Sequence, residues 1–252
     1  MPMTLAHPAA VLPLRRSGLP MIALVAGSMV PDIPLFLSWV RGYEITHSLV
    51  GVLVVDVVLA SVVVLVWFRW IRDAVVDMSP GPVRARLAEH VRLTSRQWLL
   101  VPLAGSVGAA THLLWDSFTH PGRWGPRHIE WLRTEHADLL GLKWVQYASG
   151  VLGLAVVIWV AVAYLRSLEP LPGTRRPPAL PPSVLPVVIV TAGLVGLTSA
   201  AVSVPDGFHL MAFNGVVDGL IAATALGAAA CSCWHLARRR VSDPSERQSA
   251  QE

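Results

Sequence analysis

Histidine and aspartate residues with helical spacing lie near the middle of the chain. The segment T-H-L-L-W-D-S-F-T-H contains His112, Asp116 and His120, each four residues after the last. At 100° per residue these three side chains fall within ~80° on one face of a helix. Imidazole nitrogens and carboxylate oxygens are common zinc ligands. The pattern therefore predicts a divalent metal site, and the alternative is that these groups only hydrogen-bond neighbouring helices.

Two further candidates precede this segment in the sequence. Asp32 lies in G-S-M-V-P-D-I-P, where Pro31 and Pro34 interrupt an apolar run and can free backbone carbonyls around the carboxylate. His47 lies in T-H-S at the start of the next apolar run. The start of this second run lies on the same predicted external side of the membrane as the end of the first run. We therefore expect Asp32 and His47 to join the metal site.

Two more aspartates lie inside apolar runs. Asp56 and Asp218 have no basic partner at helical spacing. Ionisable groups at membrane depth cost roughly 2.5–3.5 kcal/mol or more, so each needs a partner or a role. A proton or ion path is one interpretation, and a structural acid that hydrogen-bonds a neighbouring helix is the other.

The elements that position these residues are membrane-spanning helices. Hydrophobic residues make up 54% of the 252 residues and charged residues only 14%, with a mean hydropathy of +0.55, whereas soluble domains carry roughly 25% charged residues. Apolar runs of ~20 residues can each cross a bilayer as a helix. The sequence predicts an all-α, polytopic membrane bundle of about six transmembrane helices, at 19–40, 49–68, 98–116, 144–165, 184–204 and 211–236.

Basic residues concentrate on one side of this predicted topology. With both termini in the cytoplasm, 15 of the 20 Lys and Arg residues are cytoplasmic, and the five on the other side are Arg41, Arg123, Arg127, Arg133 and Lys143. The sequence therefore predicts a cell (inner) membrane protein with cytoplasmic termini. Scattered basic residues argue against nucleic acid as a partner. Membrane lipid is the expected partner, and the sequence identifies no protein partner.

A proline-rich segment divides the predicted spans. Residues 170–183 include P-L-P-G-T-R-R-P-P-A-L-P-P, which cannot continue a helix and favours an extended cytoplasmic linker. The expected organisation is a four-helix core at 1–169, this linker, a helix pair at 184–236 and a disordered cytoplasmic tail at 237–252.

Several motifs resemble those of a known family. The opening M-P-M-T-L-A-H-P, then G-S-M-V-P-D, T-H-S-L-V-G and G-A-A-T-H-L-L-W-D-S-F-T-H occur in one order over residues 1 to about 155. Together they resemble an uncharacterised family of bacterial multi-pass membrane proteins, a domain of unknown function. This resemblance implies no activity.

A more distant resemblance implies a type of reaction. Inner-membrane proteins catalogued as metal-dependent hydrolases show an early His, a Pro-Asp, a Thr-His-Ser and a late His-x-x-x-Asp, and the order also looks like that of the all-helical, multi-zinc phospholipase C fold. Those hydrolases carry a further His where this chain has Gly42. The likeness implies hydrolysis of a phosphoester or similar bond by water activated on a divalent metal of zinc type, with Asp32 as base or bridging ligand. The metal ligands implied are His7, Asp32, His47, His112, Asp116 and His120.

His7 conflicts with the predicted topology. It precedes the cytoplasmic Arg15 and Arg16, whereas the other candidates lie at the external ends of their helices. Three explanations remain open: the amino-terminal segment re-enters the membrane through the apolar run 8–14, His7 is not a ligand, or the topology is inverted.

Two functions from different classes fit the sequence. The first is a membrane-embedded metal-dependent hydrolase that acts on a phosphoester or lipid-linked substrate at the outer membrane face. The second is a non-enzymatic membrane protein, either a small transporter or a structural partner of other proteins. Substitution separates them, because a hydrolase depends on His112 and Asp116, whereas a transporter depends more on Asp56 or Asp218.

Overall fold

The computed structural model describes residues 4–172 and 176–242, and its contacts divide the chain into two compact units. Unit 1 comprises residues 1–65 and 93–164, and unit 2 comprises residues 66–92 and 165–252. In the described residues the only sheet is an antiparallel pair, β1 (Glu135–His136) and β2 (Leu139–Leu140), and helices make up most of the rest. This confirms the predicted all-α class.

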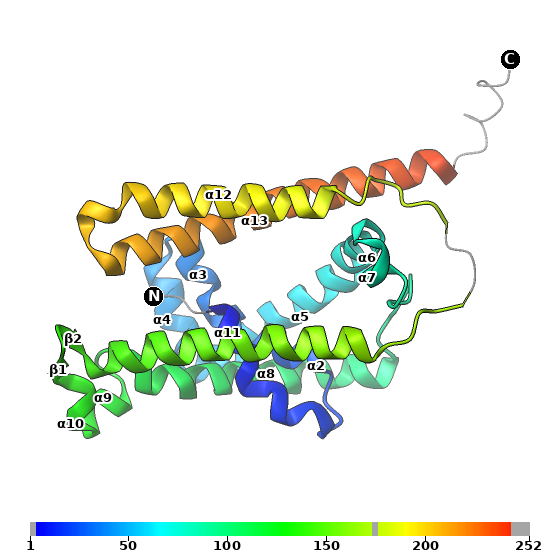
Figure 1. Ribbon diagram of the computed structural model, residues 1–252. Coiled ribbons are helices and arrows are strands. Elements are labelled where there is room, and N and C mark those ends of the chain that lie inside the picture. Colours follow the sequence, from blue (N-terminus) through cyan, green and yellow to red (C-terminus); the bar gives the residue numbers. More distant parts are fainter. Residues whose placement is uncertain (1–3, 173–175, 243–252) are drawn as a thin grey trace, which may run out of the picture. The chain divides into compact units, whose positions relative to one another are not determined.

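Unit 1 contains all of the candidate metal ligands. Its helices run from the amino terminus to α5, and then from α8 to α11 (Figure 1). They are α1 (Pro8–Val11), α2 (Met21–Gly27), α3 (Ile33–Phe36), α4 (Val40–Thr46), α5 (Asp56–Val66), α8 (Ser95–Thr119), α9 (Trp124–His128), α10 (Glu130–Arg133) and α11 (Gly141–Ser167).

Five helical segments in the described part of the chain are long and apolar enough to cross a membrane. This confirms the prediction of a polytopic membrane bundle. The segments are Gly51–Met78, Ser95–His128, Gly141–Ser167, Val184–Val202 and Phe208–Arg240.

The first predicted span, 19–40, differs from these five. It is broken into α2, a 3-10 turn at Val30–Asp32, and α3, which together form a shorter apolar segment, Met21–Phe36. Pro31 and Pro34 each lack a backbone N–H, so an uninterrupted helix cannot form through this stretch. The break therefore places Asp32 on a turn between two short helices.

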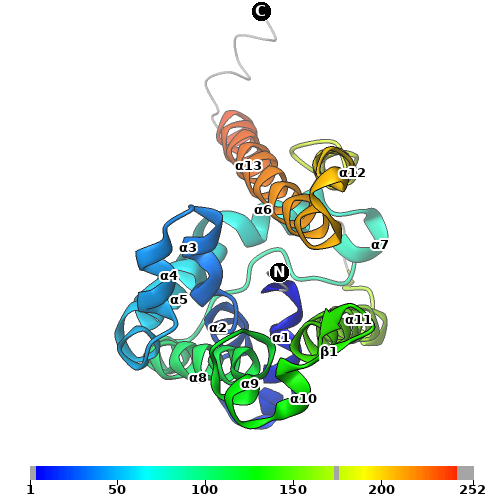
Figure 2. The ribbon, with the colours of Figure 1, turned by 90° about the vertical axis from the view of Figure 1, so that its left-hand side faces the viewer.

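Close contact between α2 and α8 forms the centre of unit 1. A Cβ atom placed on Gly27 would lie 2.1 Å from the carbonyl oxygen of Gly105, and one on Gly108 would lie 2.3 Å from that of Leu24. Only glycine permits backbones this close, as in other membrane helix pairs. Figure 2, which views these helices nearly end-on, shows α1 beside α2, α8 and α11. The amino-terminal segment is thus part of the interior of unit 1.

The long helix α8 begins at a capping box. The Thr94 side chain accepts a hydrogen bond from the backbone N–H of Gln97, and the Gln97 side chain accepts one from the backbone N–H of Thr94. This reciprocal pair satisfies two N–H groups that the first turn of a helix leaves open. The helix then runs without a break to Thr119 and carries His112 and Asp116 on consecutive turns.

Unit 2 consists of α6 (Arg72–Met78), α7 (Gly81–Arg84) and an antiparallel pair, α12 (Val184–Val202) and α13 (Phe208–Ser242). Asp77 on α6 accepts hydrogen bonds from Arg84, Trp234 and Arg238 side chains and from the Ala179 backbone. These bonds join the linker and α13 to α6. Helix α13 continues through Ser242, so residues 237–242 of the predicted tail are helical, and 243–252 lie outside the described residues.

Candidate metal centre

Asp32 lies on the 3-10 turn that follows α2. Its side chain is buried, with the residue only 4% exposed. The hydroxyl of Thr4 donates a hydrogen bond of 2.5 Å to Asp32 Oδ2. The other oxygen, Oδ1, faces the imidazoles of His47 and His112. One oxygen is therefore held by the amino-terminal segment while the other points into a cluster.

His47 directly follows the last residue of α4, and its neighbour Thr46 connects it to the Asp32 turn. The Thr46 hydroxyl donates to the carbonyl oxygen of Pro31 at 2.7 Å, which joins residues 15 positions apart. The imidazole of His47 stacks on the Tyr43 ring at 3.8 Å. A π-helical turn, Gly51–Val55, begins four residues after His47, and such turns are common at functional sites. Local contacts thus fix the direction of the His47 ring.

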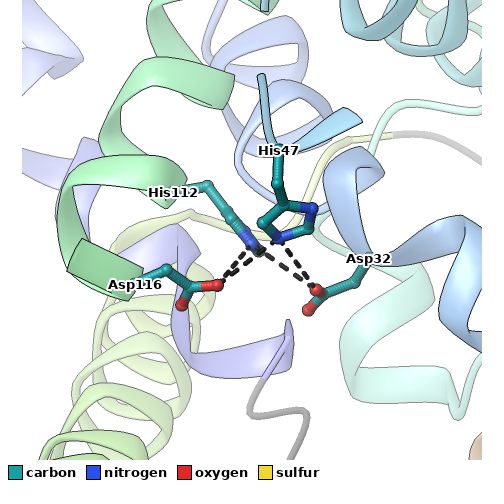
Figure 3. Close-up of side chains that lie close together, drawn as sticks. All are labelled: Asp32, His47, His112 and Asp116. Carbon is teal, nitrogen blue, oxygen red and sulfur yellow. Dashed lines mark ion pairs between the residues drawn. The ribbon is translucent and has the colours of Figure 1, made fainter. Parts of the chain in front are cut away.

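His112 and Asp116 come from consecutive turns of α8, as their spacing predicts. Both are buried, and His112 Nε2 lies 3.4 Å from Asp116 Oδ2. Asp116 Oδ2 also lies 3.4 Å from His47 Nε2. The structure therefore brings together four predicted residues from three segments of the chain, and their side chains converge on one point (Figure 3).

The spacing of these four ligand atoms fits a tetrahedral ion. Asp32, His47, His112 and Asp116 each offer one ligand atom, and these four atoms all lie within 4.8 Å of one another. The four imidazole-to-carboxylate separations are 3.4, 3.4, 3.5 and 3.8 Å. Ligands bound at ~2.0–2.1 Å to tetrahedral zinc lie about 3.3–3.4 Å apart. These four separations are therefore close to those of a tetrahedral zinc sphere, and a contraction of the cluster would complete it.

The hydrogen bonds of both imidazoles leave the inward nitrogens free to bind an ion. His112 Nδ1 lies 2.9 Å from the Ser28 carbonyl oxygen, and His47 Nδ1 lies 2.9 Å from that of Tyr43. A carbonyl only accepts, so each Nδ1 carries the hydrogen and each Nε2 keeps a lone pair. Both Nε2 atoms are buried and make no hydrogen bond to the described residues. Metal-binding histidines are oriented in this same way.

His7 and His120 lie against the second oxygen of Asp116. His7 Nε2 is 3.7 Å and His120 Nδ1 is 3.3 Å from Asp116 Oδ1, whereas His47 and His112 face Oδ2. The His7 ring also stacks on the His112 ring at 3.8 Å. The amino-terminal segment therefore reaches the cluster, whichever face of the membrane it lies on. That both histidines bind metal stays a prediction.

Burial changes the acid–base behaviour of the groups around the cluster. Burial, followed by the nearby His112 imidazole, lowers the pKa of His7 to about 3, so its ring is neutral near pH 7. Burial also raises the pKa of the Tyr43 phenol, which therefore stays protonated beside His47. The immediate surroundings thus add neutral polar groups to two carboxylates, and such a site suits a divalent cation.

Asp56 and Asp218 do not join the cluster. Asp56 is fully buried in unit 1, and neither of its carboxylate oxygens has a hydrogen-bond partner among the described residues. Asp218 belongs to unit 2, where its Oδ2 accepts a 2.5 Å hydrogen bond from Ser199. This bond between α12 and α13 matches the structural interpretation of Asp218.

Sequence reasoning missed three supporting groups: the Thr4 hydroxyl, the Thr46 hydroxyl and the Ser28 carbonyl. The signal for Thr46 was available, because it directly precedes His47 in T-H-S. No residue pattern marks a backbone carbonyl as the acceptor for a particular histidine. The Ser28 contact spans 84 positions and depends on how α2 meets α8.

Comparison with known proteins identifies the family of the chain. The chain belongs to the family described as a domain of unknown function, DUF4184, whose model matches residues 1–235. No curated protein matched, and no solved structure did. The match confirms a family without an assigned function, and the likeness to bacterial membrane hydrolases stays a prediction.

Proposed function

We propose that this member of a family of unknown function is a membrane-embedded, metal-dependent hydrolase that acts on a phosphoester or similar bond. The ion, of zinc type, would be held by Asp32, His47, His112 and Asp116. One observation supports this most strongly: two buried imidazole nitrogens, which make no hydrogen bond to the described residues, converge with two carboxylate oxygens within 4.8 Å.

The residues of the cluster would have different roles in such a reaction. A bound divalent ion supplies a Lewis acid and lowers the pKa of water toward neutrality. Asp32 keeps Oδ2 outside the ligand set, where the Thr4 hydroxyl fixes it, and this oxygen retains a lone pair that can accept a proton from attacking water. Asp32 is therefore the candidate base.

Substrate would approach from the side of His120. The His120 side chain is 27% exposed, whereas the side chains of the four inner residues are 6% exposed or less. The outer oxygen of Asp116, Oδ1, faces this opening and lies next to His120 Nδ1. A phosphoryl group that enters here meets imidazole donors before it reaches the inner cluster.

We further propose that the protein resides in the cell membrane with both termini in the cytoplasm, so that the cluster faces the outside. The supporting observation is the basic side of the topology, which carries 15 of the 20 Lys and Arg residues. A carboxyl-terminal reporter that is active only in the cytoplasm tests this orientation, and an inactive reporter would reverse it.

The metal content of the purified protein tests the proposal directly. We expect purified protein, equilibrated with zinc and then separated from unbound zinc, to hold close to one zinc ion per chain by elemental analysis. His112→Gln should hold almost none, because glutamine cannot replace the inward nitrogen. The matched control is His128→Gln, a histidine whose ring lies outside the cluster and bonds the Trp124 carbonyl. A folded wild type that takes up no metal would rule out the proposal.

A second candidate is a structural metal site in a non-enzymatic membrane protein. Four protein ligands close a tetrahedral sphere, as in structural zinc sites, whereas catalytic sites keep a position for water. Assay of the same samples on phosphomonoester and phosphodiester substrates separates the candidates. Bound metal with metal-dependent turnover supports the hydrolase, while bound metal that only raises the unfolding temperature supports the structural site.

A further inference from the structure

An apolar groove lies next to the candidate metal centre in unit 1. Its volume is about 390 Å³, within the ~300–1,000 Å³ typical of small-molecule sites. Helix α1 contributes Ala10. The longer helices contribute most of the lining: Thr111, Leu114, Trp115 and Phe118 from α8, and Val145 and Ser149 from α11.

The groove and the metal centre share a wall. Trp115 lines the groove and packs edge-on against the His7 ring, with ring centres 5.4 Å apart. Its indole N–H donates to Ser149 across the groove at 3.2 Å. Thr119, also in the lining, lies 3.0 Å from His120 Nδ1. Groove and cluster are thus separated by a single layer of side chains, and His120 lies at the point where they meet.

Positively charged side chains lie around the same opening. Lys143 Nζ donates to Gln146 Oε1 at 3.1 Å, and the Gln146 amide contacts His120 Nε2 at 3.3 Å. The backbone N–H of Arg123 donates to the His120 carbonyl oxygen at 3.4 Å, and its Nη1 donates to the His47 carbonyl oxygen at 3.4 Å. An anionic group placed beside His120 would therefore be flanked by two cations, and phosphate is well matched to such a setting.

The position of the groove in the membrane indicates which kind of molecule fills its apolar part. Both α8 and α11 lie in membrane-spanning segments, and the lining positions belong to the turns that end α8 and begin α11. Hydrocarbon chains are the solvent on the outside of such helices. A groove with an apolar floor and a cationic mouth fits a molecule with a hydrocarbon tail and an anionic head.

From this geometry we infer that the protein binds a membrane lipid with a phosphate headgroup, with the acyl chain in the groove and the headgroup beside His120, Lys143 and Arg123. As a statement about substrate, this inference rests on the proposed function, because it names the phosphoester that would be hydrolysed. As a statement about binding, it stands without catalysis.

Photolabelling tests the inference on the full chain. The probe is phosphatidic acid with a diazirine on one acyl chain, at low abundance in phosphatidylcholine vesicles that contain the protein. We expect adducts, mapped by mass spectrometry, on Leu114, Phe118 and Val145. Excess unlabelled phosphatidic acid should reduce them at least severalfold, and excess diacylglycerol, which lacks the phosphate, should not.

Two substitutions on one helix provide the matched comparison. Ser149→Phe places a ring in the groove and should remove the competed adducts, while Leu152→Phe, at a 66% exposed position of α11, should leave them unchanged. Equal metal content in both variants would show that unit 1 is intact. Adducts spread over outward-facing residues and insensitive to competition would overturn the inference.

The same experiment separates this inference from the proposed hydrolase. His112→Gln removes a proposed ligand but none of the groove lining. Competed labelling that persists in this variant, while the wild type takes up no metal, would retain the lipid site and reject the hydrolase. Normal metal uptake without competed labelling would reject the lipid site alone.

Discussion

Asp116→Asn is expected to lower zinc affinity at least ~100-fold and to reduce hydrolysis to the level of metal-free protein. Substitutions beyond the ligands themselves typically cost ~10–100-fold in metal affinity, so loss of a ligand charge should cost at least the upper end of that range. Asparagine keeps the size of the side chain but removes its negative charge. Zinc titration against a competing chelator measures the affinity, and turnover of a phosphoester panel measures the activity.

The effect should be large because Asp116 is the centre of the cluster. Its Oδ2 faces His47 and His112, and its Oδ1 faces His7 and His120. Asp116 is therefore the carboxylate that all four imidazoles share, and Asp32 faces only His47 and His112. An uncharged amide cannot replace it, since its NH₂ group would turn a donor toward at least one imidazole pair.

The control for this substitution is Asp138→Asn. Asp138 is exposed, lies on the turn between β1 and β2, and has a positive φ of 64° that asparagine also adopts readily. Metal affinity and activity should match those of the wild type. If Asp116→Asn also binds zinc as tightly as the wild type, the carboxylate is no ligand and other groups hold the ion.

The sequence was sufficient for the part of the site that lies on one helix. The spacing of His112 and Asp116 places both on one face because helical geometry is local. Asp32 and His47 followed from a weaker argument, since both were expected near the external side of the membrane in neighbouring spans. The structure brings these four together. Residue type and membrane topology therefore carry most of the information about the inner cluster.

The rest of the site depends on contacts that no local pattern contains. Thr4 reaches Asp32 across 28 positions, and His112 reaches the Ser28 carbonyl across 84. Both contacts require the amino-terminal segment and α2 to pack inside unit 1. The charge distribution suggested a position for His7 away from the cluster. Basic residues indicate on which side of the membrane a loop lies, but not how a short segment packs.

The predicted membrane spans also depend partly on local sequence patterns and partly on the packing of the whole unit. Long apolar runs predicted the membrane helices, since hydrocarbon favours an unbroken hydrogen-bonded helix. The run 19–40 was apolar enough to be counted as a span, but Pro31 and Pro34 limit it to short segments. The same prolines that shorten this span create the turn that carries Asp32.

Gly108→Ala is expected to damage both the fold of unit 1 and its metal site. A Cβ at this position would lie 2.3 Å from the Leu24 carbonyl oxygen and 2.8 Å from the Ser28 nitrogen, so α2 and α8 must move apart. Overpacking of this kind costs about 1–3 kcal/mol, which exceeds the ~0.5–1 kcal/mol that alanine gains over glycine within a helix. Unfolding in mixed micelles at increasing denaturant fraction measures the loss.

The metal site should respond because the same contact orients His112. Its Nδ1 bonds the Ser28 carbonyl at 2.9 Å, one turn along α8 from Gly108. Separation of the helices lengthens this bond and frees the imidazole to rotate, so zinc affinity should fall about 10–100-fold. The matched control, Gly193→Ala on α12, has nothing within 4 Å of the added Cβ and should be neutral or slightly stabilising. Loss of stability without loss of zinc affinity would mean that α4 and the Asp32 turn hold the cluster without the α2–α8 contact.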